Sequence, residues 1–267
     1  MDLSGKVVIV TGASSGIGRE LARQLAAKGA TLSLLARRQD ALTACAGECG
    51  PADTLVVPAD VTNPAQVASA VAATFDRFGR IDALVNSAGV GYFGSIERMR
   101  MADLDRMLHV NVYGLLHVTQ AALPYLKESH GMIVNVSSSL SKRAIPFLSA
   151  YGGAKAMVDQ LSDGMRMELR PYGIRVLTYN PPETETDFDA NAIHEEGMSM
   201  SGGGRPRKPK PVAEVAARMV AAIETERRDV VESKALMWMN VLAPKRADEM
   251  FYKAMVEPRS RKDSSAE

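Results

Sequence analysis

Short apolar runs alternate with segments of helical spacing along the chain, and this alternation limits the possible folds more than any other feature. The apolar runs are Lys6–Thr11, Thr31–Ala36, Thr54–Ala59, Ile81–Asn86, Gly131–Val136, Ile174–Asn180 and a last edge run, Asp229–Glu232. The segments with helical spacing are Gly16–Lys28, Gln39–Gly47, Ala65–Phe78, Met101–Leu126, Tyr151–Tyr172 and Val212–Glu224. Continuous apolar strands between amphipathic helices are typical of a parallel sheet covered on both faces. Since crossovers are right-handed, the pattern predicts an α/β fold: one doubly wound parallel sheet of about seven strands with helices on both faces.

No linker or internal repeat divides the first 180 residues, and residues 1–267 are predicted to form a single domain. One stretch changes character: Glu183–Pro211 is rich in Gly, Pro, Met and charge, which predicts a long mobile loop over a substrate site. The polar tail 257–267 is predicted to be frayed. The helical segment Met101–Leu126 could be interrupted near Asn111–Gly114.

The apolar stretch Ala235–Ala243 is too short to span a bilayer, which takes about 20 residues. Because the stretch contains Trp238, peripheral contact with a lipid surface is kept as an alternative. Packing of a helix on the core, or on another subunit, is the favoured interpretation. Near the N-terminus the run Val7–Val10 is too short for a secretory signal, which needs a longer apolar stretch.

Charge and cysteine usage exclude several classes of protein. The formal net charge is +1, whereas a nucleic-acid-binding protein would usually show a basic excess, so no nucleic-acid partner is expected. Cys45 and Cys49 are interpreted as reduced thiols of a cytoplasmic protein. The four histidines share no metal-ligand spacing with cysteines or carboxylates, so no metal site is expected: His109, His117, His130 and His194.

A glycine-rich turn, Thr11–Gly18, lies between the first strand and the first helix. Glycines allow a tight turn and a close approach of the backbone to a pyrophosphate, and the helix N-terminus supplies unpaired N–H groups. In this position the motif is strong evidence for a dinucleotide site. The residues predicted to contact the phosphates are Gly12, Ser14, Ser15, Gly16, Ile17 and Gly18.

The end of the second strand indicates which dinucleotide binds. An NAD enzyme would have a carboxylate there, whereas this chain has Arg37 and Arg38, and Asp40 is expected inside the next helix. Guanidinium groups suit a 2′-phosphate, so the predicted cofactor is NADP(H). The alternative is that both arginines are solvated residues at a helix start. Residues after the third and fourth strands are predicted to border the adenine and the ribose: Asp60, Val61, Asn86, Ala88 and Gly89.

Tyr151 and Lys155 are four residues apart on a predicted helix and therefore share a face. A nearby cation favours the phenolate, so Tyr151 is expected to ionise more readily than a free phenol, whose pKa is about 10. Such a group suits proton transfer to or from a carbonyl oxygen. The serines Ser137, Ser138 and Ser139 lie at the end of a sheet strand, where doubly wound folds bind ligands.

Together these motifs resemble the short-chain dehydrogenase/reductase family over roughly residues 2–186, which implies a Rossmann-type dinucleotide-binding and catalytic domain. The resemblance implies that Tyr151 is the general acid or base and that Ser138 orients the carbonyl oxygen, with Ser137 and Ser139 as competing candidates. Lys155 would bind the nicotinamide ribose and lower the proton affinity of Tyr151, and Asn111 would hold a water in the proton path. The family also implies a homodimer or homotetramer.

Two positions depart from the family pattern. Ser87 replaces a frequent second asparagine, and the usual Pro-Gly pair is Pro181-Pro182. Pro181, Thr184 and Thr186 are predicted to contact the cofactor, and Thr186 matches the family threonine that contacts the nicotinamide amide. The stretch from Pro181 to Thr186 weakly resembles 3-ketodihydrosphingosine reductases, which favours a role in lipid metabolism.

The substrate is predicted to be a hydrophobic ketone, lipid-like (for example 3-ketosphinganine) or steroid, because the expected pocket is apolar. Its predicted contacts are Ser138, Leu140, Phe147, Tyr151 and Phe188. The sequence therefore predicts an NADPH-dependent oxidoreductase that transfers hydride between the nicotinamide and a ketone or secondary alcohol. The alternative is a catalytically silent NADP(H)-binding regulator or scaffold, which the complete Asn, Ser, Tyr and Lys set argues against.

Overall fold

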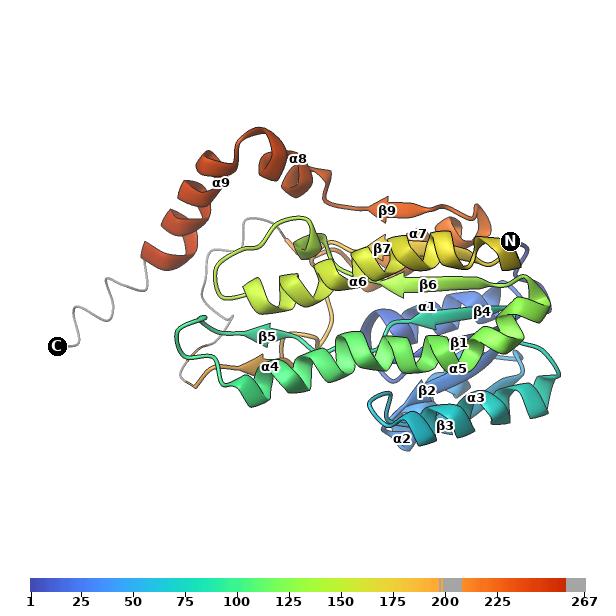
Figure 1. Ribbon diagram of the computed structural model, residues 1–267. Helices are drawn as coiled ribbons and strands as arrows, with labels where there is room; N and C mark the ends of the chain where they lie inside the picture. Colours follow the sequence, from blue (N-terminus) through green and yellow to red (C-terminus); the bar gives the residue numbers. More distant parts are fainter. Residues whose placement is uncertain (197, 199–207, 258–267) are drawn as a thin grey trace.

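The structure, a computed structural model, describes residues 1–196, 198 and 208–257. Its main sheet has seven strands, all parallel, in the order β3-β2-β1-β4-β6-β7-β9 (Figure 1). The strands are β1 (Val7–Thr11), β2 (Thr31–Ala36), β3 (Thr54–Pro58), β4 (Ala83–Asn86), β6 (Met132–Val136), β7 (Arg175–Asn180) and β9 (Asp229–Val231). The predicted doubly wound parallel sheet is thereby confirmed.

Helices cover both faces of the sheet. Successive residues along a strand point into two separate hydrophobic cores, one on each face. The helices around the sheet are α1 (Gly16–Ala27), α2 (Gln39–Glu48), α3 (Pro64–Phe78), α5 (Gly114–Ser129), α6 (Ser149–Glu168) and α7 (Val212–Glu224). On β1, Val8 and Val10 belong to the core under α1, α2 and α7, whereas Ile9 belongs to the core under α3, α5 and α6. Because side chains alternate across a strand, a strand that is apolar throughout can supply both cores.

The strand order reverses direction at β1, which pairs with β2 on one side and with β4 on the other. In open α/β sheets, ligands bind at such a switch point, outside the carboxyl ends of the strands. The segments that follow β1, β4, β6 and β7 are therefore the ones that can build a site.

The predicted helix over Met101–Leu126 is a continuous helical segment with a changed geometry in its middle. It consists of α4 (Met101–Leu108), a π-helical turn (His109–Tyr113) and α5, which continues to Ser129 despite Pro124. The expected interruption near Asn111–Gly114 thus takes the form of a wider turn rather than a break. Such π-helical turns occur frequently at functional sites.

A second, two-stranded parallel sheet joins β5 (Tyr92–Phe93) to β8 (Ile193–His194). β8 lies inside the predicted mobile loop 183–211, and a further bridge joins Thr184 to Lys210 near the two ends of that loop. The loop is thus held at its base and against β5. The remainder of the predicted loop, residues 197 and 199–207, and the predicted frayed tail from residue 258 lie outside the described residues.

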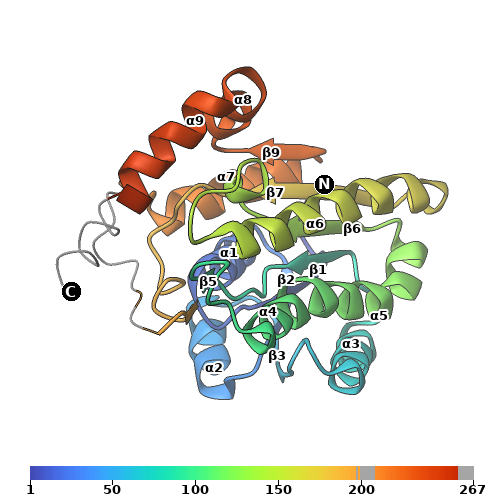
Figure 2. The ribbon, with the colours of Figure 1, turned by 60° about the vertical axis from the view of Figure 1, so that its left-hand side comes forward.

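The C-terminal helices α8 (Lys234–Leu242) and α9 (Pro244–Phe251) lie beyond the edge strand β9 (Figures 1 and 2). Trp238, Val241 and Leu242 of α8 are 53%, 67% and 73% exposed, so packing of these side chains on the core is excluded. Contact of α8 with another subunit or with lipid stays a prediction. Within the described ranges, no helix combines the length and the apolar character that crossing a membrane requires.

Candidate active site

The turn after β1 is built around a close approach of backbone to backbone. Gly12 has φ +68°, and a Cβ atom placed on it would lie 2.9 Å from both the N and the Cα of Ala88. Thr11 holds the same two segments together, because its Oγ1 accepts from the N–H groups of Ser87 and Ala88 at 3.0 Å. Only glycine at position 12 allows the loop after β4 to lie this close.

The turn ends at the N-terminus of α1, where it can receive an anion. The first N–H groups of an α-helix have no partner within the helix, and Ser15, the N-cap residue, makes no side-chain capping bond to them. The methyl group of Thr186 lies 3.4 Å from the position of a Cβ on Gly16, so the predicted cofactor residue after β7 does lie over the turn. This combination fits the pyrophosphate of a dinucleotide.

Arg37 and Arg38 follow β2 and are exposed. Arg38 is the N-cap residue of α2, and Asp40 lies in the first turn of that helix, as predicted. Among the described residues, neither guanidinium is engaged in an ion pair or hydrogen bond, so both arginines are available at the carboxyl edge of the sheet.

The residues predicted to border the adenine and ribose divide into two groups. Asp60 accepts from the N–H and hydroxyl of Thr62, and Val61 is buried where α5 begins, since a Cβ on Gly114 would lie 2.7 Å from its Cγ2. Asn86 is different: its Nδ2 donates into the core, to Thr119 and Asn135. The Asn86 side chain thus braces the sheet against α5, and a border between this residue and the cofactor stays a prediction.

The three candidate serines after β6 have different partners. Ser137 Oγ donates to the carbonyl of Lys155 at 3.0 Å, and Ser139 Oγ donates to the carbonyl of Pro181 at 2.7 Å. Ser138 is the residue whose hydroxyl forms a hydrogen bond with the Tyr151 side chain. The Ser138 Oγ also accepts a hydrogen bond from the Leu140 N–H at 3.2 Å. The geometry thus favours Ser138 over its two neighbours.

Tyr151 and Lys155 lie on the first turns of α6, and both are buried. The Lys155 Nζ lies 5.9 Å from the centre of the Tyr151 ring and donates to the carbonyl of Val136 at 2.9 Å. A Cβ on Gly89 would lie 2.8 Å from Asn111 Oδ1 and 3.5 Å from this Nζ, so the bare glycine lets both side chains approach. Four of the predicted site residues, Asn111, Ser138, Tyr151 and Lys155, therefore gather at one end of the sheet.

Asn111 lies in the π-helical turn, and backbone groups occupy its amide. Its Nδ2 donates to the carbonyls of Val90 and Met107 at 2.7 and 3.0 Å, and its Oδ1 accepts from the Val90 N–H at 3.3 Å. The amide fixes the loop after β4 to this turn, and a role in holding a water stays a prediction.

The ionisation of Tyr151 differs from the sequence expectation. Burial raises the pKa of Tyr151 well above that of a free phenol, and only the contact with Ser138 acts in the opposite direction. Burial also lowers the pKa of Lys155 to about 8. The prediction that Tyr151 ionises readily is wrong for this structure, because desolvation of the buried phenol outweighs the opposing contact with Ser138.

Apolar side chains pack around Tyr151. The ring of Phe188 lies 5.5 Å from the Tyr151 ring, and both join Leu140 and Tyr92 in one cluster. Phe147 lies apart from that cluster and packs against Phe93, with ring centres 6.0 Å apart. Of the predicted substrate residues, Leu140 and Phe188 thus pack in one cluster with the tyrosine, whereas Phe147 packs against Phe93.

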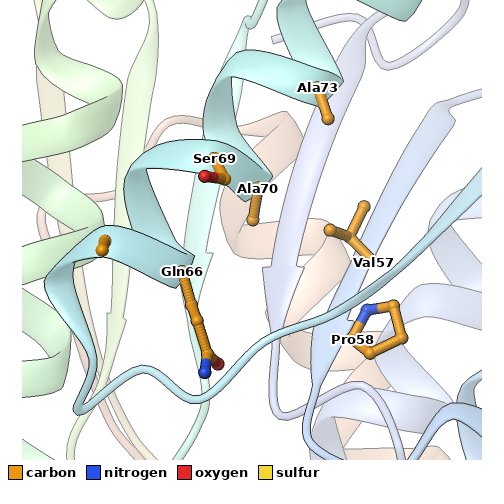
Figure 3. A pocket seen from close by; sticks show the side chains of 7 residues that line it. Val57, Pro58, Gln66, Ser69, Ala70 and Ala73 are labelled. Atoms are coloured by element: carbon orange, nitrogen blue, oxygen red, sulfur yellow. The ribbon is translucent and has the colours of Figure 1, made fainter.

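Two further cavities lie within the described residues, and the second shares Tyr92 with this cluster. One of about 430 Å³ lies between β3 and α3, lined by Val57, Pro58, Ala65, Gln66, Ser69, Ala70 and Ala73 (Figure 3). None of the predicted site residues lines it. The other, of about 480 Å³, adjoins β5 and β8 and is lined by Tyr92, Arg98, Arg100, Asp103, His194, Glu195 and Glu196.

The sequence reasoning missed residues that hold the site together. Thr11 joins the phosphate turn to the loop after β4, and a buried pair, Asp159 and Asn180, joins α6 to β7. The position of Thr11, at the end of a strand and next to the glycine turn, could have indicated its role. Nothing in the local sequence around Asp159 indicates that its partner lies 21 residues further on. Over the described part of the chain, no group of His, Cys, Asp or Glu residues is arranged to hold a metal ion.

A doubly wound sheet with a phosphate turn at its switch point, and with Ser, Tyr and Lys side chains gathered beside it, defines a nicotinamide-dinucleotide-dependent oxidoreductase. The model of the short chain dehydrogenase family matches residues 6–197. The chain belongs to the short-chain dehydrogenase/reductase family and is an NAD(P)-dependent oxidoreductase.

Relatives of known sequence extend this result. The chain is 32% identical over 270 residues to dehydrogenase/reductase SDR family member 7B of Mus musculus, covering 98% of this chain and 83% of that protein. It is 39% identical over 201 residues to 11-beta-hydroxysteroid dehydrogenase A of Sesamum indicum, covering 73% of this chain and 57% of that protein. The chain thus spans little more than half the length of the plant relative.

Solved structures share the fold. A short-chain dehydrogenase from Streptomyces avermitilis superposes with a TM-score of 0.79 at 29% identity, covering 97% of this chain and 99% of the other. A short-chain dehydrogenase from Burkholderia cenocepacia in complex with NADP gives 0.79 at 26% identity, covering 94% and 99%. A Brucella melitensis 3-ketoacyl-(acyl-carrier-protein) reductase complexed with NADH gives 0.76 at 31% identity, covering 85% and 97%.

Proposed function

We propose that the protein reduces a hydrophobic ketone with NADPH, with Tyr151 as the proton donor to the carbonyl oxygen. The observation that carries this proposal is the distribution of the serine hydroxyls: Ser137 and Ser139 are bonded to backbone carbonyls, and Ser138 meets Tyr151. A carbonyl oxygen that accepts from both hydroxyls would be oriented by Ser138 and protonated by Tyr151.

The nicotinamide, when bound, supplies the hydride. Lys155 would hold the nicotinamide ribose, and the turn from Gly12 to Gly18 would hold the pyrophosphate. Burial keeps the Tyr151 phenol protonated at neutral pH, which suits an acid in reduction. Phe188 and Leu140 would exclude water from the phenol.

The apolar cluster around Tyr151 supports a steroid or long-chain lipid ketone as substrate, and the Sesamum indicum relative carries the name of a hydroxysteroid dehydrogenase. The test is a screen for NADPH oxidation with steroid ketones, 3-ketosphinganine and a small polar ketone as comparison. We expect kcat/KM to be higher for the apolar ketones by about tenfold or more, because each buried CH₂ contributes about 0.8 kcal/mol. Equal values for the polar ketone would contradict the substrate class.

The cofactor preference rests on Arg37 and Arg38. We expect Arg37→Ala and Arg38→Ala each to weaken NADPH binding by about tenfold, since a charge-assisted hydrogen bond contributes about 1.5–3 kcal/mol, and to leave NADH binding nearly unchanged. Fluorescence titration of both cofactors measures the effect. Arg77→Ala is the control, because it removes an exposed guanidinium that pairs with Asp53 elsewhere. Equal NADPH and NADH affinity of the wild type would contradict the preference.

Cofactor binding should also depend on pH through Lys155. Its pKa is lowered to about 8 by burial, so the ammonium is present below that pH and is lost above it. We expect NADPH affinity to fall as pH rises through this value, by at most about tenfold per pH unit. In Lys155→Met the affinity should be low and flat across the same range. A pH-independent wild type would contradict the role of Lys155 in binding.

We also propose a cytoplasmic homo-oligomer. Cys45 and Cys49 are free and buried, which fits a reducing compartment. Met157 of α6 and Tyr113 beside α5 are each 45% exposed, which supports pairing of these helices between subunits. Light scattering of the purified protein tests the oligomer.

A further inference from the structure

Asp159 is a buried carboxylate that takes no part in the proposed proton transfer or cofactor binding. It lies on α6 one helical turn after Lys155 and is only 8% exposed. Burying a carboxylate is costly unless charges or hydrogen bonds compensate it. Its partners therefore indicate what the protein gains from placing it there.

The partners of Asp159 include the turn that carries Ser138. Ser141 Oγ donates to Asp159 Oδ2 at 2.5 Å, and Lys142 Nζ donates to the same oxygen at 2.7 Å. Ser141 ends the 3₁₀ turn that Ser138 caps, and the Ser141 N–H donates back to the Ser138 carbonyl at 3.0 Å. The carboxylate thus fixes this turn to the helix that bears Tyr151.

Asn180, at the end of β7, connects the same groups from the opposite side. Its Nδ2 lies 3.1 Å from Asp159 Oδ1, 3.1 Å from the Ser138 carbonyl and 2.9 Å from Ser141 Oγ. Asn180 is fully buried. A single amide group therefore joins the carboxylate to the backbone of Ser138, so displacement of one shifts the other.

Asp159 also acts on Lys155 electrostatically. Burial lowers the pKa of Lys155, and the Asp159 charge raises it again. Within the described residues, the other groups around the ammonium are uncharged: Tyr151 from α6, Asn111 from the π-helical turn and Gly89 from the loop after β4. Among the described residues, Lys142 also faces Asp159, and the charge of Asp189 acts on the neighbouring Tyr151.

We propose that Asp159 is a positioning residue of the active site, which holds Ser138 in register with Tyr151 and supports the charge of Lys155. The inference rests on the proposed roles of Ser138 and Lys155. The proposal has two parts that can be measured separately. Asp159 affects turnover through the position of Ser138, and it affects the titration of Lys155 through its charge.

The experiment compares Asp159→Asn, which keeps the shape, with Asp159→Glu, which keeps the charge. Asp163→Asn is the matched control, because Asp163 lies one turn further along α6 and pairs with Arg166 and Arg228 instead. The first measurement is an NMR titration of ¹³C-labelled lysines in the cofactor-free protein, with the Lys155 signal assigned from Lys155→Met. The second is turnover of 3-ketosphinganine and NADPH affinity at about pH 6.5, where Lys155 is charged.

We expect Asp159→Asn to move the Lys155 midpoint below that of the wild type and to lower kcat by about tenfold, while NADPH affinity at the acidic pH is unchanged. Asp159→Glu should restore the midpoint but not the full kcat, because the longer side chain displaces the turn. Asp163→Asn should match the wild type in every measurement.

A Lys155 midpoint and a kcat that are the same in Asp159→Asn as in Asp163→Asn would overturn the inference. A wild type that turns over none of the ketones would instead refute the proposed function, and the Lys155 titration would still decide for or against Asp159. Circular dichroism melts verify that each variant is folded. If Asp159→Asn does not fold, the comparison of Asp159→Glu with the wild type decides on kcat alone.

Discussion

Tyr151→Phe is expected to lower kcat by about a thousandfold or more, since a positioned general acid contributes about 10²–10⁴ in rate. The substitution removes one hydroxyl and keeps the ring that packs against Phe188. Lys155 keeps its bond to the Val136 carbonyl, so NADPH affinity should stay within about twofold of the wild type. Stopped-flow and steady-state absorbance of NADPH, together with fluorescence titration, measure the two quantities separately.

Tyr92→Phe is the matched control for this substitution. Tyr92 belongs to the same apolar cluster and is 1% exposed, but the charged groups that act on its hydroxyl are Glu195, Asp103 and Arg100. If Tyr151→Phe loses activity and Tyr92→Phe keeps it, Tyr151 is identified as the acid. Activity retained in Tyr151→Phe would refute the assignment. A wild type that binds NADPH tightly and reduces no ketone would favour the regulator or scaffold instead.

The fold could be predicted because its determinants are local. A strand such as Val7–Thr11, apolar at every position, serves two cores only when helices cover both faces of its sheet. The glycine turn between β1 and α1 could be predicted for the same reason: the residues that form it are adjacent in the sequence.

The choice among adjacent groups could not be predicted, because it depends on partners far away in the sequence. The hydroxyls of Ser137 and Ser139 donate to the carbonyls of Lys155 and Pro181, and no local pattern distinguishes these serines from Ser138. Asn86 directs its amide inward because Asn135 of the neighbouring strand lies there.

Ionisation was mispredicted for a related reason. Spacing places Tyr151 and Lys155 on one helix face, but the pKa of the phenol follows the depth of burial, which the whole fold sets. The exposed α8 is a similar case: its apolar residues fit a helix that packs on the core or on another subunit, yet in the described part of the chain β9 is the edge strand and α8 lies beyond it.

Gly12→Ala is expected to weaken cofactor binding strongly and to destabilise the fold. The left-handed backbone at Gly12 costs a residue with a Cβ about 1–2 kcal/mol. The new methyl would also lie 2.9 Å from the backbone of Ala88, which cannot move without breaking the two N–H contacts to Thr11. The loops after β1 and β4 should therefore separate, and NADPH affinity should fall by about a hundredfold or more, the equivalent of about 2.7 kcal/mol.

Gly50→Ala separates the backbone strain from the steric clash. Gly50 has φ +65°, close to that of Gly12, but a Cβ there meets no atom within 4 Å. It should therefore lose only the strain energy, a decrease of about 1–2 kcal/mol in the free energy of unfolding, with NADPH binding intact. Denaturant unfolding and cofactor titration of both variants provide the comparison. If Gly12→Ala bound NADPH as well as Gly50→Ala did, the contact between these two loops would not be what shapes the phosphate site.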